Sequence, residues 1–302
     1  MSVSETFRLK TDFLGQAPKN MSRLYYFGCT LFSVFLVVLI FVVMALQTGP
    51  ALFDVGMGML STKWNPALGQ YGILPMLFGT FIVMMIAMSL ALPVGVMAAI
   101  CIAEIKTEKL RRFLRGALEI LAGIPSIVYG LIGVAYLSVW VAQGFELQSG
   151  RLILTAGLLL SVMILPTILS LTIDAILNVP RDFRENASAL GLYKSEVFRD
   201  VIWPSARGEV VGAAFLALGR AMGETMAVML VIGSLDRLPS PLFNVLSSGQ
   251  SITSKLGREV SESAFGSTHF SVLVFMGLLL MSITVLLTAL SQYFFTRDPS
   301  LG

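Results

Sequence analysis

Charged side chains are scarce in this chain of 302 residues, where aspartate, glutamate, lysine and arginine make up 13% of the sequence. Soluble globular domains carry about 25%. Histidine occurs once, as His269, and cysteine twice, as Cys29 and Cys101. Two isolated thiols without CxxC spacing predict neither a metal site nor a disulfide framework, and a lone imidazole is a poor metal candidate. The composition excludes an ordinary soluble domain, and we expect no metal site and no role for the histidine.

A nucleotide-binding loop is also missing from the sequence. There is no GxxxxGK[ST] phosphate loop, and no polar stretch is long enough to form a soluble enzymatic domain. We therefore expect a chain that has no catalytic residues, carries no cofactor of its own and does not hydrolyse a nucleotide.

Apolar sequence is abundant instead, with 56% hydrophobic residues and a mean hydropathy of +0.82. A helix needs roughly 20 apolar residues to cross a bilayer. We predict an all-α integral membrane protein whose single domain, residues 24–295, follows a segment 1–23 and precedes a tail 296–302. The predicted spans are 24–46, 72–103, 117–142, 152–176, 208–234 and 270–295. The first is longer than the core of about 7–15 residues in a signal peptide, so we expect an uncleaved anchor.

The basic residues are distributed unevenly between the predicted loops. Fifteen of the 21 lie in the N-terminal segment, the second and fourth connections and the C-terminal tail, whereas five lie in the other loops. By the positive-inside rule both termini are in the cytoplasm. The net charge of +3 then reflects membrane topology, and nucleic-acid binding is not expected.

The fourth connection, residues 179–207, contains VPRDFRENASALGLYKSEVFRDVIWPSAR. Asp182 followed by Glu185 predicts a capped helix, Gly191 a turn, Ser195 the start of a second helix and Pro204 its end. Such a loop, without an apolar core of its own, is expected to lie on a partner or on lipid headgroups. An interfacial amphipathic loop is the simplest alternative.

The spacing within this connection resembles the EAA loop of ABC importer permeases, E-A-A-x3-G-x9-I-x-L-P. The residues on that pattern are Glu185, Ala187, Gly191, Val201 and Pro204. Val201 replaces isoleucine, Asn186 an alanine and Trp203 a leucine. The resemblance implies a six-helix, type I (MetI-like) permease fold, in which this loop docks on a separate ATPase subunit.

The stretch GRAMGETMAV places Arg220 and Glu224 inside the fifth predicted span, one helical turn apart, so we expect them to share a face. An ionised side chain at bilayer depth costs about 2.5–3.5 kcal/mol even on insertion scales. Three interpretations compete: a self-neutralising pair that locks helix packing, a proton relay, and an anion site or gate. The third is favoured, because the guanidinium fork suits a tetrahedral oxyanion and Thr225 adds a hydroxyl group. Gly219 and Gly223 would let another helix approach.

The third span contains AGIPSIVYGLIG, residues 122–133. Pro125 removes a backbone donor and predicts a kink, which a membrane tolerates where the freed carbonyl finds a partner. Ser126 and Tyr129 are candidate polar groups facing a transport path. An ordinary proline kink is the alternative, and Pro166-Thr167 in span four is a weaker case of the same kind.

These two stretches, with the EAA-like loop, resemble the phosphate permease subunits of ABC importers, of PstC rather than PstA type. The resemblance covers most of residues 75–235 and implies phosphate import across the bacterial cytoplasmic (inner) membrane. It also implies a second permease of PstA type, two ATPase subunits of PstB type that bind ATP and magnesium, and an external phosphate-binding protein of PstS type. Sulfate, molybdate or tungstate permeases, an ATP-independent secondary transporter or channel, and a purely structural or signalling subunit are the alternatives.

Overall fold

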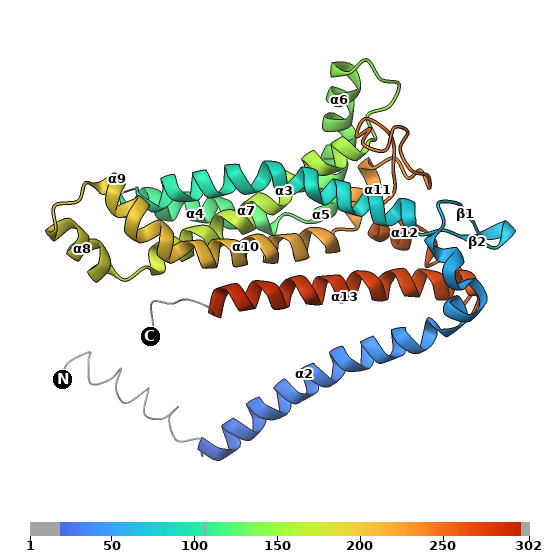
Figure 1. Cartoon of the computed structure of the whole chain (residues 1–302), viewed down its shortest axis with the longest axis horizontal. Coiled ribbons are helices and arrows are strands. Elements are labelled where there is room, and N and C mark those ends of the chain that lie inside the picture. Colours follow the sequence, from blue (N-terminus) through green and yellow to red (C-terminus); the bar gives the residue numbers. More distant parts are fainter. Residues whose placement is uncertain (1–18, 106, 297–302) are drawn as a thin grey trace, which may run out of the picture.

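The protein is described by a computed structural model that covers residues 19–105 and 107–296. Long helices run side by side along its longest axis, and within these residues the strands are two short ones at one end (Figure 1). The expected segments 1–23 and 296–302 lie largely outside the described residues. The prediction of an all-α chain is confirmed.

Six helical segments are long and apolar enough to span a membrane, as the sequence predicted. They are Leu24–Leu60, Leu74–Ala103, Ser126–Gly144, Ile153–Asn178, Lys194–Gly223 and Thr268–Phe295. The helices that form the bulk of the molecule are α2 (Lys19–Gln47), α3 (Leu74–Ala103), α4 (Glu108–Gly123), α7 (Ile153–Asn178), α10 (Trp203–Gly223) and α13 (Thr268–Thr296). At 30 residues, α3 is about 45 Å long and exceeds the hydrocarbon thickness of about 30 Å, as expected for the second span.

Helix α7 is the centre of the bundle, and two thirds of the residues in its most apolar stretch of 18 residues are buried. It packs against α3, α10 and α4. Glycines permit the closest of these contacts: a Cβ at Gly157 would lie 2.5 Å from Ile86, and one at Gly95 would lie 2.9 Å from Ile168. Small residues at these points therefore let α3 and α7 approach each other as membrane helices commonly do.

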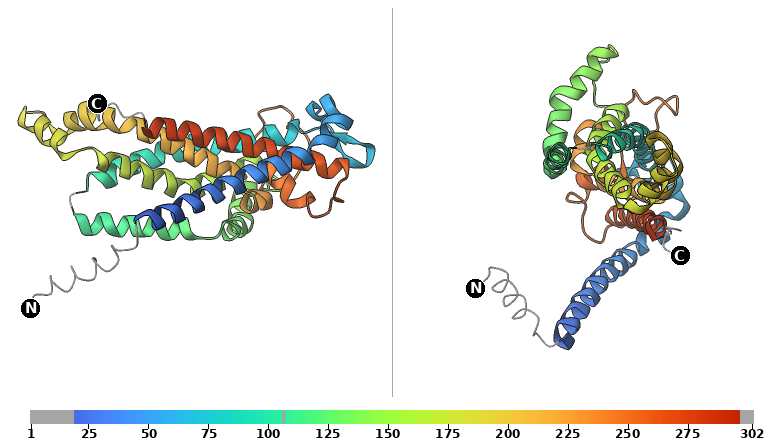
Figure 2. Two further views of the ribbon diagram at one scale, coloured as in Figure 1. Left: turned by 90° about the horizontal axis from the view of Figure 1, so that it is seen from below. Right: turned by 90° about the vertical axis from the view of Figure 1, so that its left-hand side faces the viewer.

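Helix α2 leans away from the bundle, and the part of it that contacts α13 lies near its C-terminal end (Figures 1 and 2). Its side chains over 24–43 are all exposed in the single chain. Such a surface is suited to lipid or to another membrane subunit.

The prediction of one continuous helix over the third span, 117–142, is wrong. Helix α4 ends at Gly123, and a new segment begins at Ser126 after Pro125. That segment consists of α5 (Ser126–Ile132), η4 (Gly133–Leu137) and α6 (Ser138–Gly144), and α6 projects away from the bundle (Figure 1). Proline removes the donor that would have continued the helix.

The fifth predicted span, 208–234, begins earlier and ends earlier than expected. Helical structure runs without interruption from Lys194 through α9 (Lys194–Glu196), η5 (Val197–Ile202) and α10. It stops at Gly223, and a separate short helix α11 (Met226–Val231) follows.

The two ends of the bundle carry different elements (Figure 1). One end holds α8 (Arg181–Ala189) and α9, together with the first residues of α2 and the last of α13. The other end holds a short antiparallel hairpin of two strands, the connections around it and the short helix that precedes α13. Its elements are η1 (Ala51–Val55), η2 (Gly56–Leu60), β1 (Trp64–Asn65), η3 (Pro66–Leu68), β2 (Gln70–Tyr71) and α12 (Ile252–Glu259).

Candidate functional site

The helix that carries the GRAMGETMAV stretch is broken inside that stretch. Helix α10 ends at Gly223, Glu224 has an extended backbone (φ −70°, ψ 113°), and α11 begins after Thr225. Arg220 therefore lies on the last turn of α10 and Glu224 in the break, so the prediction of one shared helical turn is wrong. No ion pair joins the two side chains within the part of the chain that the structure describes. A glycine without packing partners favours such a break, because glycine destabilises a helix interior.

Polar side chains satisfy the backbone groups that the break frees. The Glu224 carbonyl accepts a hydrogen bond from Thr253 Oγ1 at 3.0 Å, and the Glu224 N–H donates to the Ala221 carbonyl at 3.3 Å. The Thr225 hydroxyl donates to the Gly223 carbonyl at 3.3 Å. Irregular backbone of this kind occurs in membranes where it lines a cavity or is buried in protein.

Arg220 remains close to two of the other predicted site residues. Its charge acts electrostatically on the carboxyl group of Glu224 and on the hydroxyl of Tyr129. The Arg220 side chain is exposed in the single chain, whereas the neighbouring Ala217 and Ala221 are buried. The structure therefore brings Arg220, Glu224 and Tyr129 to one place and leaves the guanidinium accessible.

A second break, at Ile124 and Pro125, lies beside the first. The Tyr129 hydroxyl donates a hydrogen bond to the Leu121 carbonyl at 2.8 Å, which gives a partner to a carbonyl near the end of α4. Helix α5 packs against α11, and a Cβ at Gly130 would lie 3.0 Å from the Ala227 Cα. Tyr129 thus connects the two helices on either side of the second break, and its hydroxyl is already engaged.

The remaining predicted residues contribute less to this site. Ser126 is half-buried at the start of α5, and Thr225 is half-buried in the first break. Gly219 lies against α13, where a Cβ would be 3.8 Å from Thr284, but a Cβ at Gly223 would meet no atom within 4 Å. The close helix approach expected at Gly223 is therefore wrong.

The space on the hairpin side of Glu224 is almost closed. A cavity of about 10 Å³ lies there among Thr80, Leu160, Glu224, Ser251 and Thr253. A cavity needs roughly 10–15 Å³ of this kind to hold one water molecule. An ion larger than a water molecule does not fit, so the site is shut on the hairpin side in this conformation.

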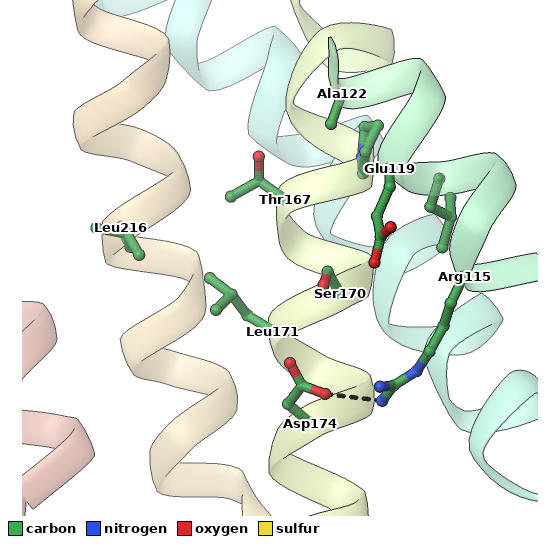
Figure 3. A pocket seen from close by; sticks show the side chains of 10 residues that line it. Arg115, Glu119, Ala122, Thr167, Ser170, Leu171, Asp174 and Leu216 are labelled. Atoms are coloured by element: carbon green, nitrogen blue, oxygen red, sulfur yellow. Dashed lines mark hydrogen bonds and ion pairs between the residues drawn. The ribbon is translucent and has the colours of Figure 1, made fainter. Parts of the chain in front are cut away.

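The space on the α8 side is open. A cavity of about 350 Å³ lies between α4, α7 and α10 (Figure 3), and Leu216, one turn before Arg220, is on its wall. Arg115 and Asp174 point toward one another across it, with 2.7 Å between Nη2 and Oδ1, and Glu119 points into it. The cavity therefore lies one helical turn of α10 away from Arg220, on the side of α8 and α9.

Sequence reasoning missed the acids in this cavity. Glu119 and Asp174 lie within predicted apolar spans, which was the signal available, and Arg115 was counted only as a loop charge. Helix α7 continues through Pro166, and both Pro166 and Thr167 line the cavity.

The fourth connection forms a helix, a glycine turn and a second helix, as predicted. Gly191 has φ +86°, a conformation that L side chains rarely adopt, which explains the glycine. Helix α8 begins without a side-chain cap, so the capping role predicted for Asp182 is wrong. Tyr193 replaces Ser195 as the N-cap of α9, and its N–H donates to the Glu196 carboxylate at 2.7 Å.

Pro204 does not end the second helix. It lies in the first turn of α10, directly after the π-helical segment η5, inside a helical run that is continuous from Lys194. The helix of this connection thus continues directly into the span that carries Arg220.

The connection also has an apolar core, contrary to prediction. Ala187, Val197 and Ile202 are buried and pack with residues at the ends of α3 and α7. Arg184 donates to the Ile176 carbonyl at 2.7 Å and lies 3.8 Å from Glu104. The loop is therefore fastened to α3 and α7 as well as to α10.

The outer surface of this connection is exposed. Glu185, Gly191 and Pro204 are exposed, Val201 is half-buried, and Ala187 is buried in the apolar core. Two large side chains beside the turn also face outward, with Leu190 82% and Tyr193 77% exposed. The exposed apolar groups give this surface the character of a docking site.

Comparison with known proteins gives these features a family. The profile of the binding-protein-dependent transport system inner membrane component family matches residues 91–298. The match includes both helix breaks, the fourth connection and α12.

Several curated proteins are similar over most of their length. The phosphate transport system permease protein PstC of Haemophilus influenzae is 37% identical over 262 residues, covering 80% of this chain and 81% of that protein. PstC of Mesorhizobium japonicum is 36% identical over 256 residues, covering 78% and 77%. The probable ABC transporter permease protein YqgH of Bacillus subtilis is 35% identical over 239 residues, covering 78% and 76%.

Two solved structures share the fold. A bacterial ABC transporter involved in the import of the acidic polysaccharide alginate has a TM-score of 0.53 at 12% identity, covering 93% of this chain and 98% of that chain. The MetNI methionine ABC transporter in an inward facing conformation has a TM-score of 0.50 at 20% identity, covering 74% and 94%. At these identities the likeness bears on the fold alone, and it agrees with the MetI-like architecture expected from the sequence.

Proposed function

Because this chain belongs to the inner membrane components of binding-protein-dependent transport systems, we propose that it is one permease subunit of an ATP-driven importer of inorganic phosphate. Relatives that match most of this chain carry the name phosphate transport system permease. The function rests on that kinship and on the chemistry of the site around Arg220.

The exposed guanidinium of Arg220 is the observation that carries the proposal. Arginine stays charged at physiological pH and presents a planar fork of donors that suits a tetrahedral oxyanion. A charged carboxylate at Glu224, which interacts electrostatically with Arg220, would offset part of that attraction, so that the site would bind the ion weakly enough to release it. The self-neutralising pair considered from the sequence is disfavoured, because no ion pair joins the two side chains among the described residues.

The conformation supports transport toward the α8 end. The hairpin side of Glu224 is closed to a cavity of about 10 Å³, and the α8 side opens into one of about 350 Å³. This arrangement would correspond to an inward-open conformation. The polar groups of Thr167 and Ser170 along the larger cavity offer hydrogen bonds to an ion that leaves Arg220.

The fourth connection would couple this site to ATP hydrolysis. Its exposed face at Glu185, Gly191 and Leu190 docks on a partner ATPase, and its buried face is fastened to α3 and α7. A rigid-body movement of the ATPase can then pass into the helices that carry the site. ATP and magnesium would be held by the ATPase, and this chain would catalyse no covalent step.

The complete importer would contain four kinds of protein. A second, homologous permease of PstA type would face this chain and complete the path, and two ATPase subunits of PstB type would bind the α8 ends. A phosphate-binding protein of PstS type would deliver the ion at the hairpin end. The complex would lie in the bacterial inner membrane with both termini of this chain in the cytoplasm, as the basic residues indicate.

Uptake of labelled phosphate by the complete complex in proteoliposomes tests this function. We expect ATP-dependent uptake that unlabelled phosphate suppresses and that sulfate, molybdate and tungstate do not. Equal suppression by one of these other anions would assign the permease to that anion instead. Ion-driven transport by the single chain without the ATPase would make it a secondary transporter.

A further inference from the structure

A charged side chain is completely buried at the hairpin end of the molecule. Lys255, on α12, is 0% exposed. Its ammonium lies 2.5 Å from Asp236 Oδ2 and 2.5 Å from Glu259 Oε1. The ring of Trp64 lies beneath it, with 4.6 Å between Nζ and the ring centroid. One cation therefore joins the segment after α11, α12 itself and the outer hairpin.

The cluster continues from Glu259 to α13. His269 Nε2 lies 3.1 Å from Glu259 Oε2, and the imidazole stacks on Tyr71 with 6.0 Å between ring centroids. It also meets Trp64 edge-on at 5.8 Å. The residues of the cluster, Trp64, Tyr71, Asp236, Lys255, Glu259 and His269, thus come from four segments that are far apart in the sequence.

The charged residues of this cluster depend on one another. A buried ammonium is tolerated because two carboxylates and an aromatic face surround it, and the removal of one partner leaves a buried charge uncompensated. The network joins α12 to the segment after α11 through Asp236, to the hairpin through Trp64 and to α13 through His269.

The other end of α12 touches the candidate site. The Ile252 N–H donates to Thr80 Oγ1 at 2.9 Å, and the Thr253 hydroxyl donates to the Glu224 carbonyl at 3.0 Å. Gly79 permits the contact, because a Cβ there would lie 2.0 Å from the Gln250 carbonyl oxygen. The first turn of α12 is thus packed directly over the break and lines the nearly closed cavity beside Glu224.

We propose that Lys255 is the positioning residue of the outer gate. Through Asp236 and the Trp64 ring, and through Glu259 to His269 on α13, it holds α12 over Glu224, so that the outer side of the path stays closed while the inner side is open. The inference rests on the proposed transport function, because a gate requires a path, but it does not depend on which anion is carried.

Thiol labelling of the assembled complex from the outside tests this role. In a chain with Cys29 and Cys101 replaced by serine, Met84→Cys places a reporter on the wall of the closed cavity. We expect Lys255→Met to raise the rate at which a membrane-impermeant maleimide reacts with this reporter by at least tenfold. The matched control is Lys63→Met, an exposed lysine of the same loop system, which should leave the rate unchanged. An unchanged rate in Lys255→Met would overturn the proposal.

A second measurement separates a gate from a merely structural residue. A structural defect lowers the amount of complex and all its activities together. A loosened gate instead raises ATP hydrolysis in the absence of the binding protein, while substrate uptake per complex falls. If Lys255→Met fails to insert, Thr253→Val is used, since it removes the hydroxyl that contacts the Glu224 carbonyl and the Ser251 hydroxyl. Equal labelling of this variant and the parent would overturn the proposal. The labelling needs no substrate, so an error in the proposed anion would leave its outcome untouched.

Discussion

A substitution at Gly191 tests whether the shape of the turn between α8 and α9 matters for coupling. Gly191 has φ +86°, and a Cβ added there meets no atom within 4 Å. A substitution at this position is therefore limited by the backbone conformation and not by the space around the side chain. An L residue held in the left-handed region costs roughly 1–2 kcal/mol, and β-branched valine is among the least tolerant. We expect Gly191→Val to relax into another turn in the free permease.

The strain sets the size of the expected effect. Docking on the ATPase would have to restore the turn, so 1–2 kcal/mol translates into roughly 5- to 30-fold weaker binding. Gly191→Asn is the matched control, because asparagine has a side chain of similar size and visits the left-handed region routinely. It should stay within about threefold of the parent.

Co-purification with the ATPase and ATP hydrolysis stimulated by the binding protein measure both effects. The Gly191→Val permease should insert normally. It should lose the bound ATPase subunit when that subunit is at low concentration and bind it again when the subunit is in excess. Full coupling in Gly191→Val at all ATPase concentrations would refute the reasoning. Equal losses in Gly191→Val and Gly191→Asn would refute the backbone argument and point to steric contact at the turn.

Three further outcomes are expected. Tyr129→Phe removes the hydrogen bond that spans the second helix break and should destabilise the complex by about 1–3 kcal/mol; an unchanged thermal unfolding midpoint in detergent would contradict this. Gly79→Ala puts a Cβ where the Gln250 carbonyl oxygen lies 2.0 Å away, so α12 must shift and uptake should fall in vesicles, and full uptake would argue against a close fit of α12. In a background without native cysteines, Ser261→Cys should react with an impermeant maleimide from outside and Ser188→Cys should not; the reverse pattern would invert the topology.

The sequence predicted the membrane class and the number of spans well, because long apolar runs report directly on burial in lipid. It also predicted the helix, turn and helix of the fourth connection, because the turn requires a positive φ at Gly191 that glycine adopts readily. Details of capping at Asp182 and Ser195 were wrong. Caps depend on local geometry that several neighbouring polar residues can supply equally well.

The helix breaks and the buried cluster were harder to predict. Hydropathy does not register a backbone break, so Arg220 and Glu224 were placed on one helical turn that ends between them. No role was predicted for Lys255, because Asp236 and the Trp64 ring come close to it only in the folded chain. Sequence spacing indicates which residues share a turn, whereas contacts between distant loops require the folded chain.

The role of Arg220 in the path is the central claim, and phosphate import by a complex carrying Arg220→Gln tests it most directly. Charge-assisted hydrogen bonds contribute about 1.5–3 kcal/mol each, so the account predicts import lowered by roughly 10- to 100-fold while assembly and ATPase binding stay normal. Arg151→Gln, at an exposed arginine just before α7, should import normally. Undiminished import by correctly assembled Arg220→Gln complexes would contradict the account.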